Sequence, residues 1–501
     1  MQSFIKIHER DNVAVALENL SVNQEIGIND EVIIIREEVP AGHKFALVDL
    51  MPGDEVIKYG YSIGHIIQKV KQGEWIHTHN VKTGLGELLE YSYQPIQETD
   101  EETRPQVNLT EEELFFYGYR RNNGKVGIRN EIFIIPTVGC VNDIARLLEK
   151  KSKELYSDLV DEVIAFAHPY GCSQLGDDHN NTQKILSGLI QHPNAAGVLV
   201  LGLGCENNHI DGMKQQLGEY EADRVKFLNC QDCEDEIEEG LKLLEELARY
   251  AQGFQREKIS AGELIIGLKC GGSDGLSGIT ANPLVGAFSD LLINVGGTSI
   301  LTEVPEMFGA ETILMKRCVN EEVFEQTVNL INDFKKYYME HNQPVYENPS
   351  PGNKKGGITT LEDKSLGCTQ KSGSSLVRGV FQYGEQVDKK GLLLLSSPGN
   401  DLVASTALAA SGAHIILFTT GRGTPFGAPV PTIKISSNSS LAVKKKDWID
   451  FDAGKLLSGI TLPELSHELY RFVLDVASGK KVKSEENGYH DLAIFKQGVT
   501  L

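Results

Sequence analysis

The pattern of apolar and polar positions divides the chain into regions of different character. Up to about residue 95 the apolar runs are short, lie between turns and show little helical periodicity, which predicts a compact β-rich domain. From Phe115 onward strand-like runs alternate with helical spacing, which is typical of α/β domains. The stretch at 94–113 is acidic and holds two prolines, as linkers do. We therefore predict a β-rich domain at 1–95, an acidic linker at 96–112, a central α/β domain at 113–385 and a Rossmann-like α/β domain at 386–501.

In the α/β region, five strand-like runs each have a cysteine close to their carboxyl end. The intervals between these cysteines suit a strand, a crossover helix and the next strand. A single cysteine is commonly a small buried hydrophobe, but ligands bind outside the carboxyl ends of parallel strands. The recurrence therefore predicts a site shared by four of them, namely Cys140, Cys172, Cys205 and Cys270.

The loop CGGSDGLSGITANP begins at Cys270 and follows the apolar run at 264–268. Its glycines permit tight turns and close approach to a ligand. Ser273 and Asp274 supply a hydroxyl and a carboxylate there, and are candidate catalytic residues. Lys354 and Arg422 lie in other glycine-containing loops, where each is a candidate for anchoring a substrate carboxylate.

Histidines add further candidates. His168 ends a strand-like run beside Cys172 and is a candidate general base, with a purely structural role as the alternative. His77 and His79 project from the same face of an extended segment, which suits either ligand binding or a polar pair at a domain interface. The acidic residues just before His179 suit a helix cap better than a metal site.

Composition restricts the class of protein. The 501 residues carry a formal net charge of -22, which argues against nucleic acid as a partner and requires a locally basic pocket for any anionic substrate. We expect a cytoplasmic protein with no membrane partner, because we find neither a long apolar run nor a signal peptide. In that compartment the eight cysteines are expected to be reduced. Cys230 and Cys233 form an isolated CxxC pair in an acidic context that disfavours a thiolate.

Several long motifs resemble the altronate/galactarate dehydratase family from one end of the chain to the other. They include PTVGCVN, PYGCSQLGDDH, GLGCENN, CGGSDGLSGITANP, LTEVPEMFGAE, ENPSPGNKKGGITTLEDKSLGCTQKSG, TTGRGTP and LAIFKQGVTL. The resemblance implies that 1–95 form a SAF-like β-clip domain and that 113–385 form the central α/β catalytic domain. It also implies iron(II)-dependent dehydration of D-altronate to 2-dehydro-3-deoxy-D-gluconate in hexuronate catabolism. The galactarate-acting members lack the HTHN and GDDH segments, which makes His77 and His79 candidate substrate selectors.

The chemistry implied by this resemblance removes a proton beside a carboxylate and expels hydroxide from the next carbon. We expect the four cysteines to hold or border the iron, with His168 as the base and with Lys354 and Arg422 as substrate anchors. Manganese(II) and an iron–sulfur cluster are the alternative cofactors. The alternative functions are dehydration of another sugar acid such as galactarate, or binding of a sugar acid or metal without catalysis, with thiol redox chemistry ranked last. We expect a homo-oligomer.

Overall fold

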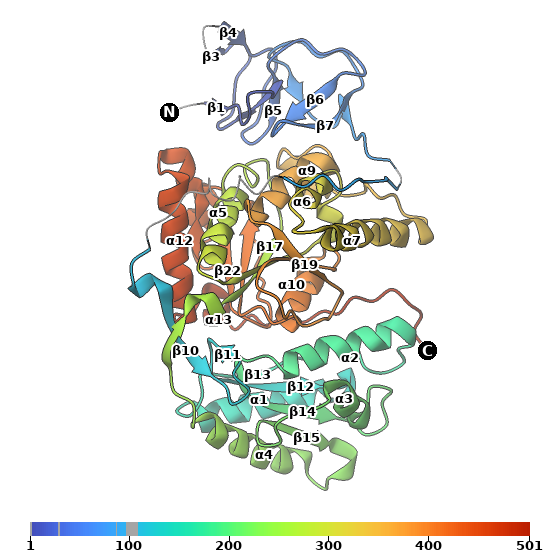
Figure 1. Ribbon diagram of the computed structural model, residues 1–501, viewed down its shortest axis with the longest axis vertical. Coiled ribbons are helices and arrows are strands. Elements are labelled where there is room, and N and C mark those ends of the chain that lie inside the picture. The colour runs from blue at the N-terminus through green and yellow to red at the C-terminus, as the bar shows by residue number, and fades with distance from the viewer. Residues whose placement is uncertain (1–2, 29–30, 87, 97–108) are drawn as a thin grey trace.

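The computed structural model describes residues 3–28, 31–86, 88–96 and 109–501. The described chain forms three domains stacked along the long axis of the molecule (Figure 1). The N-terminal β-rich domain caps one end, the domain built on β12–β15 lies at the other end, and the C-terminal domain lies between them. Most of the predicted linker, 97–108, falls outside the described residues.

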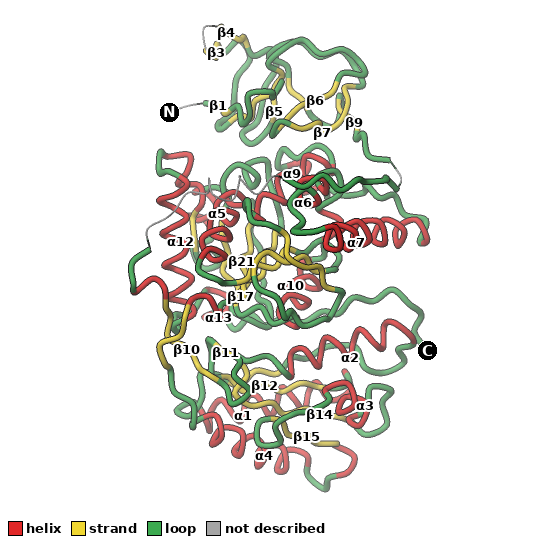
Figure 2. Tube along the Cα trace, viewed as in Figure 1, coloured by secondary structure: helices red, strands yellow, loops and turns green. Residues whose placement is uncertain are grey.

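The N-terminal domain consists of short strands joined by turns (Figure 2), as the sequence predicts. Its described strands pair in the orders β1-β2-β5-β8, β3-β4 and β6-β7-β9. Two small apolar clusters fill it, one around Phe45 and one around Val56 and Ile63. The strands are Phe4–Ile5 (β1), Val13–Ala16 (β2), Glu25–Ile28 (β3), Glu31–Ile34 (β4), Lys44–Ala46 (β5), Glu55–Lys58 (β6), Tyr61–Ile66 (β7), Trp75–Ile76 (β8) and Val81–Lys82 (β9).

The second domain is built on a parallel sheet of order β13-β12-β14-β15. Helices α1 and α4 pack in one apolar cluster on this sheet, and α2 packs in another. The antiparallel strands β10, β11 and β16 form a separate small sheet. The elements are Phe115–Arg120 (β10), Val126–Gly127 (β11), Glu131–Pro136 (β12), Asn142–Tyr156 (α1), Val163–Ala165 (β13), Gly176–Ile190 (α2), Ala195–Gly202 (β14), Ile210–Leu217 (α3), Val225–Asn229 (β15), Glu236–Ala251 (α4) and Glu257–Ser260 (β16).

The C-terminal domain contains a seven-stranded parallel sheet of order β19-β20-β18-β17-β21-β22-β23. Helices α5 and α12 share one apolar cluster with this sheet and α10 shares another, so the sheet is covered on both faces. The strands are Ile265–Cys270 (β17), Thr298–Leu301 (β18), Val377–Phe381 (β19), Gly391–Leu395 (β20), Ile415–Thr420 (β21), Thr432–Ser436 (β22) and Phe451–Asp452 (β23). The helices are Ala281–Asn294 (α5), Glu311–Met315 (α6), Glu321–Glu340 (α7), Pro351–Lys355 (α8), Leu361–Thr369 (α9), Asp401–Ala410 (α10), Ser439–Lys444 (α11), Leu462–Ala477 (α12) and Lys483–Glu486 (α13).

The predicted boundary between 385 and 386 is wrong, because it cuts through this single sheet. Strands β17 and β18 precede the boundary and pair with β21 and β20, which follow it. The sheet therefore joins two segments that the sequence pattern assigned to separate domains. The change of domain falls before β17 instead.

The second and C-terminal domains share one continuous core. Apolar side chains of α2 and α10 belong to a single cluster that spans both sheets. At their contact a Cβ on Gly188 would lie 2.3 Å from the backbone oxygen of Ala410, so only glycine fits there. The end of the chain also returns to the second domain, where the backbone N–H groups of Gln497 and Gly498 donate to the buried carboxylate of Asp178 at 2.9 and 2.8 Å.

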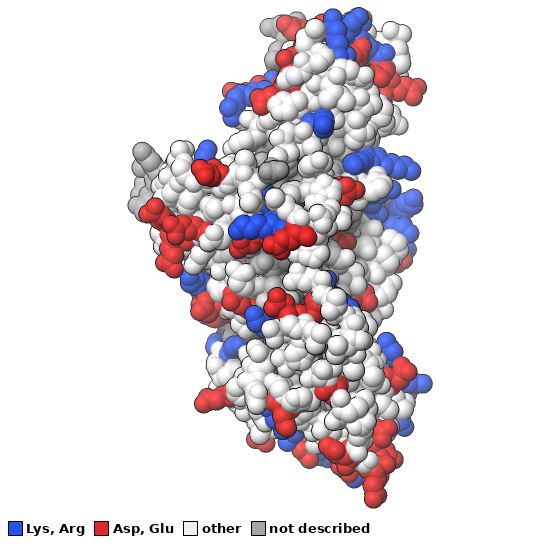
Figure 3. All heavy atoms as spheres, turned by 90° about the vertical axis from the view of Figure 1, so that its right-hand side faces the viewer, with Lys and Arg blue, Asp and Glu red and all other residues white. Residues whose placement is uncertain are grey.

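The surface has no broad basic area on the face shown in Figure 3, where acidic and basic side chains are interspersed and acidic groups gather at the lower end. This distribution agrees with the strongly negative net charge of the chain. None of the helices in the described ranges is long and apolar enough to cross a membrane.

Candidate active site

The strongest concentration of buried charge lies where β17 and β18 end, against the N-terminal domain. Cys270 closes β17 and is buried, and its Sγ lies 2.6 Å from the Oγ of Ser273 in the glycine-rich loop. Its backbone N–H donates to Oε2 of Glu303 at 2.9 Å. The strand, the thiol at its end and the polar loop are therefore arranged as the sequence predicts.

Glu303 follows β18 in a left-handed backbone conformation with φ of 68°, which is uncommon for residues other than glycine. Its carboxylate accepts hydrogen bonds from the buried ammonium groups of Lys269 and Lys371. Burial and the nearby charge of Glu306 raise the pKa of Glu303 to about 7, against the effect of both lysines. Backbone strain and a carboxyl that titrates near neutrality are both common at functional sites.

Glu306 is a second buried carboxylate close to Glu303. Lys364 donates to its Oε1 at 2.8 Å, and Sγ of Cys368 lies 3.1 Å from its Oε2. Burial would raise the pKa of Glu306, but Lys364, Lys269 and Lys371 outweigh it and lower the value to about 2. Glu306 therefore stays ionised at neutral pH.

The two cysteines of this cluster differ in pKa. A hydrogen bond from Cys368 and the charge of Lys371 lower the pKa of Cys270 to about 5, although burial opposes them. The same hydrogen bond, together with burial, raises the pKa of Cys368. Cys270 is therefore the thiolate of the pair at neutral pH and Cys368 is the thiol.

The N-terminal domain supplies the other wall of the site. Lys44 and Lys58 both bond the carboxylate of Asp363 in the C-terminal domain, at 2.8 and 2.9 Å. All three side chains are almost completely buried. Burial would raise the pKa of Asp363, but the two lysines hold it well below its usual range.

Glycines bring the two domains this close. A Cβ on Gly275 would lie 1.9 Å from the backbone oxygen of Gly42, and one on Gly278 would lie 2.3 Å from Oη of Tyr59. The loop that the sequence suggested for close approach to a ligand is therefore pressed against the N-terminal domain instead. A cavity of about 10 Å³ remains between them, room for one water molecule at most. Its lining includes Lys58, Tyr59, Ser273, Asp363, Lys364 and Cys368.

The four cysteines predicted to share a site do not converge. Cys140, Cys172 and Cys205 are exposed in loops of the second domain, whereas Cys270 is buried in the C-terminal domain. The three loops are neighbours, since the N–H of Gly139 donates to the oxygen of Tyr170 and the N–H of Asn208 to that of Gly171. Within the described ranges, however, no three His, Cys, Asp or Glu side chains form a group that could hold a metal ion. The prediction failed because similar strand ends belong to two different sheets.

His168 is not placed as a general base. It is buried in the second domain, where its Nε2 bonds the oxygen of Pro136 at 2.7 Å and its Nδ1 accepts from the N–H of Tyr170 at 3.2 Å. Burial lowers its pKa to about 4. Because both ring nitrogens are engaged by the backbone, the ring holds two loops together and neither nitrogen is open to a substrate.

The remaining predicted residues lie around the glycine-rich loop or at its margin. Asp274 accepts hydrogen bonds from Ser437 and other groups, so its carboxylate fastens the loop to the strand end of β22. Arg422 is exposed, and its Nη1 lies 3.5 Å from the oxygen of Gly352 at the start of α8, the helix that carries the half-exposed Lys354.

The two histidines of the N-terminal domain differ. His77 is buried against His43 and Trp75, its Nδ1 lacks a hydrogen-bond partner, and burial lowers its pKa to about 3. His43 in turn bonds the oxygen of Lys355. His77 therefore lies at the domain interface. The sequence left this position and ligand binding open as the two interpretations of the spacing between His77 and His79. His79 is exposed beside Trp75.

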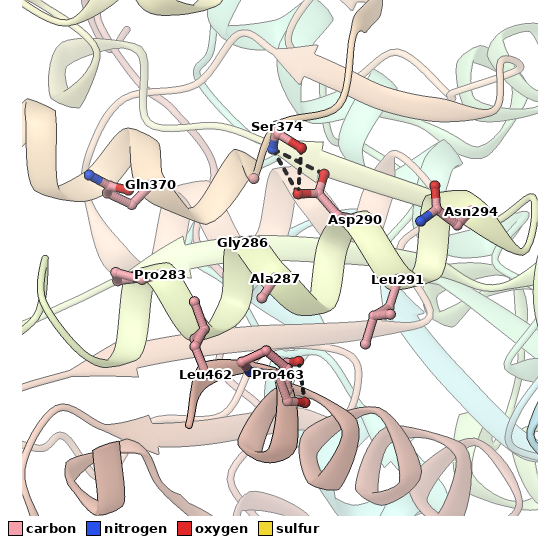
Figure 4. A pocket seen from close by; sticks show the side chains of 12 residues that line it. Pro283, Gly286, Ala287, Asp290, Leu291, Asn294, Gln370, Ser374, Leu462 and Pro463 are labelled. Carbon is pink, nitrogen blue, oxygen red and sulfur yellow. Dashed lines mark hydrogen bonds between the residues drawn. The ribbon is translucent and has the colours of Figure 1, made fainter. Parts of the chain in front are cut away.

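A separate cavity of about 310 Å³ lies between α5 and α12 (Figure 4). Its lining is mainly apolar, and the carboxylate of Asp290 at its edge is turned toward Ser374, which bonds it. This cavity lies on the flank of the sheet and brings together no group of titratable side chains. We therefore assign no chemistry to it.

Sequence reasoning missed the buried lysines, which carry most of the positive charge of the site. Lys44 begins the strand KFA, and Lys269 stands between Leu268 and Cys270. A lysine inside an otherwise apolar strand was the available signal, because burial of an ammonium requires a carboxylate partner. The partners themselves come from distant segments, such as Asp363 for Lys44, 319 residues away.

The comparisons with known proteins define a sugar-acid dehydratase with a SAF domain, and the chain belongs to the altronate/galactarate dehydratase family. Three family models match it in order. They are the altronate/galactarate dehydratase SAF domain over 2–84, the second domain of D-galactarate dehydratase/altronate hydrolase over 118–252, and the C-terminal domain of D-galactarate/altronate dehydratase over 261–500.

Individual relatives match along the whole chain. The altronate dehydratase of Bacillus subtilis (strain 168) is 54% identical over 504 residues, which cover 100% of both chains. The altronate dehydratase of Escherichia coli (strain K12) is 52% identical over 500 residues, covering 99% of this chain and 100% of the relative. The galactarate dehydratase (L-threo-forming) of Escherichia coli (strain K12) is 35% identical, covering 98% and 96%.

Proposed function

We propose that the protein is a hydro-lyase that dehydrates D-altronate to 2-dehydro-3-deoxy-D-gluconate in hexuronate catabolism. The observation that carries this proposal is the full-length similarity to altronate dehydratases, which exceeds the similarity to the galactarate enzyme. Dehydration of another sugar acid such as galactarate is the second candidate. The buried lysines of the site suit either substrate, because both are carboxylates.

In this reaction the bond between C2 and its hydrogen breaks, and its electron pair passes either directly or through an enediolate of the carboxylate toward C3. The double bond between C2 and C3 forms as the bond between C3 and its hydroxyl breaks, and the hydroxide takes up a proton and leaves as water. The resulting enol tautomerises to the 2-keto acid. The site must therefore accept a proton from C2, donate one to the leaving hydroxyl and stabilise negative charge on the carboxylate.

The cluster at the ends of β17 and β18 contains groups for each task. Cys270, the thiolate, is the acceptor of the C2 proton, since its Sγ adjoins Ser273 and Cys368, both of which line the cavity. Lys364 lines the same cavity and is the donor to the leaving hydroxyl. Ser273 orients the thiolate and Asp274 fixes the loop that carries them both.

We assign substrate anchoring to Lys354 and Arg422, at the outer edge of the site. Lys354 and Arg422 flank the glycine-rich loop on its outer side, where they attract an anionic substrate toward an otherwise acidic protein. His77 lies across the domain interface and is retained as a selector between sugar acids.

We retain iron(II) as the proposed cofactor, with manganese(II) or an iron–sulfur cluster as alternatives. The described residues present no ready group of three metal ligands, so no step of the scheme is routed through a metal. Metal analysis and acid-labile sulfide of anaerobically purified protein distinguish these cofactors. Cys270 bonds Ser273 inside the C-terminal domain, and we assign it to proton transfer in place of iron ligation.

The experiment is anaerobic turnover of D-altronate and of galactarate, with iron(II) added or chelated, following the 2-keto-3-deoxy product directly. We expect product from altronate and its loss in Cys270→Ser, whereas Cys318→Ser, a matched buried cysteine that bonds Thr327, retains turnover. Stoichiometric binding of altronate without product would refute the proposal in favour of a binding protein. Light scattering of the same preparation tests the proposed homo-oligomer.

A further inference from the structure

The scheme proposed above leaves two groups in altered protonation states after each turnover. Cys270 has gained the proton from C2, and Lys364 has given a proton to the leaving hydroxyl. The proton must therefore pass from Cys270 to Lys364 before the next substrate is dehydrated. Both residues are buried, with 1% and 7% of their surface exposed, so their exchange of protons with bulk water is restricted.

Two buried groups that take no part in the scheme lie between them. Cys368 hydrogen-bonds the thiol of Cys270 on one side, and its Sγ lies 3.1 Å from Oε2 of Glu306 on the other. The opposite oxygen of Glu306, Oε1, lies 2.8 Å from Nζ of Lys364. The four side chains therefore form a continuous line of contacts from the proton acceptor to the proton donor.

This line of four side chains has the properties of a proton relay. The thiol of Cys368 carries a single hydrogen, so it donates to Cys270 and to Glu306 in turn. A carboxylate has an acceptor oxygen on each side, and Glu306 presents one to Cys368 and the other to Lys364. Because direct contacts make up the line, it needs neither a cavity between the domains nor a bridging water.

The charges around the line set its direction. A hydrogen bond from Cys368 and the charge of Lys371 lower the pKa of Cys270 to about 5, although burial opposes them. Burial lowers the pKa of Lys364, but the ion pair with Glu306 outweighs it and raises that pKa. A proton on Cys270 therefore moves downhill to a neutral Lys364.

The other buried carboxylate, Glu303, leads elsewhere. It accepts from the backbone N–H of Cys270 at 2.9 Å. Its partner Lys269 also bonds Asp401 at 2.9 Å, and the side chain of Asp401 is 36% exposed, so that branch leads toward solvent. A proton that leaves by this branch does not reach Lys364.

We infer that Cys368 and Glu306 return the proton from Cys270 to Lys364 between turnovers. This inference rests on the proposed function and adds two relay residues to its site. Cys368 gives its hydrogen to Oε2 of Glu306 as its sulfur takes the one from Cys270, and Glu306 gives a proton to the neutral amine of Lys364. The thiolate, the thiol, the carboxylate and the ammonium of the resting site are then restored in that order along the line.

The test separates the first turnover from the later ones in the full-length protein. The variant is Cys368→Ala, which removes the thiol hydrogen from the line, and the matched control is Cys318→Ala, a buried cysteine that bonds Thr327, for which both rates stay unchanged. A single turnover with enzyme in excess starts from the resting protonation state, so its rate changes by less than about 3-fold in Cys368→Ala. The steady-state rate on altronate falls by about 100-fold, because each later turnover waits for the proton. Both rates are measured on the alkaline plateau of the pH profile, where Cys270 is a thiolate without the hydrogen bond from Cys368.

A conservative variant distinguishes a relay from a packing role. Cys368→Ser keeps a hydrogen that can be passed on, so its steady-state rate should exceed that of Cys368→Ala by about 10-fold or more. If Cys368→Ala does not fold, Cys368→Val fills the position without a transferable hydrogen, and the same separation of the two rates is expected.

Equal loss of the first-turnover and steady-state rates would show that Cys368 is structural and would overturn the inference, as would an unchanged steady-state rate. Transfer of deuterium from C2 of altronate to C3 of the product would also overturn it, because Cys270 would then discharge onto the product. No product from the wild type with either sugar acid refutes the proposed function and the relay with it, whereas the other outcomes overturn the relay alone.

Discussion

Replacement of Gly275 by alanine tests whether the SAF domain must lie against the glycine-rich loop during catalysis. The backbone N–H of Gly275 bonds the oxygen of Gly356 at 2.7 Å, so the loop is fixed to its own domain. A Cβ at this position would lie 1.9 Å from the oxygen of Gly42 in the SAF domain, whereas ordinary contact begins at 3.4 Å. The oxygen belongs to the backbone and the Cβ is fixed to it at Gly275, so neither can rotate away and the domains must move apart by about 1.5 Å.

This displacement is large enough to break the interdomain ion pairs. Lys44 and Lys58 reach Asp363 at 2.8 and 2.9 Å, and a shift of that size takes both beyond hydrogen-bond distance. Overpacking of a well-packed contact costs about 1 to 3 kcal/mol. A misplacement of about 1 Å in an active site lowers the rate by about 100-fold, which is the loss of kcat/KM that we expect.

The assay measures product formation from altronate beside hydrogen–deuterium exchange over residues 270–280. The control is Gly27→Ala, an exposed glycine of β3 with no atom within 4 Å of its Cβ position, for which both measurements stay unchanged. If Gly275→Ala exchanges like the wild type and turns over altronate at the wild-type rate, the domain contact described here is not the active arrangement.

Two further predictions concern titration. Glu303→Gln removes a carboxyl whose pKa is about 7 beside the Cys270 thiolate. We expect a less basic thiolate, a kcat lower by about 10-fold or more and the loss of an inflection near pH 7, whereas Glu311→Gln, a buried glutamate paired with Lys335, keeps the wild-type profile. In the second, burial lowers the pKa of His168 to about 4 and that of His192 to about 3. The unfolded chain binds protons at these histidines below about pH 6.5 and the folded chain does not, so the midpoint of thermal unfolding should fall between pH 7 and pH 5. A constant midpoint would contradict this.

Local pattern was sufficient to predict the strands and the groups at their ends. The run that ends in Cys270 forms β17, and the turn-rich N-terminal segment forms the β-rich domain. Ser273, in the loop after β17, contacts Sγ of Cys270. These features depend on residues close in sequence, since periodicity and glycine placement act over a few positions. The family resemblance likewise rests on contiguous motifs and therefore needed no structure.

Only the tertiary structure decided which strand ends meet. Cys140 and Cys270 have similar local settings, yet they lie in different sheets, because strand order depends on contacts between segments far apart in the chain. The same cause placed the domain boundary before β17 and left His168 enclosed by backbone. The pairing of Lys58 with Asp363 spans 305 residues. Periodicity carries no signal for such a pairing, since burial of the two charges becomes favourable only when the folded domains bring them together.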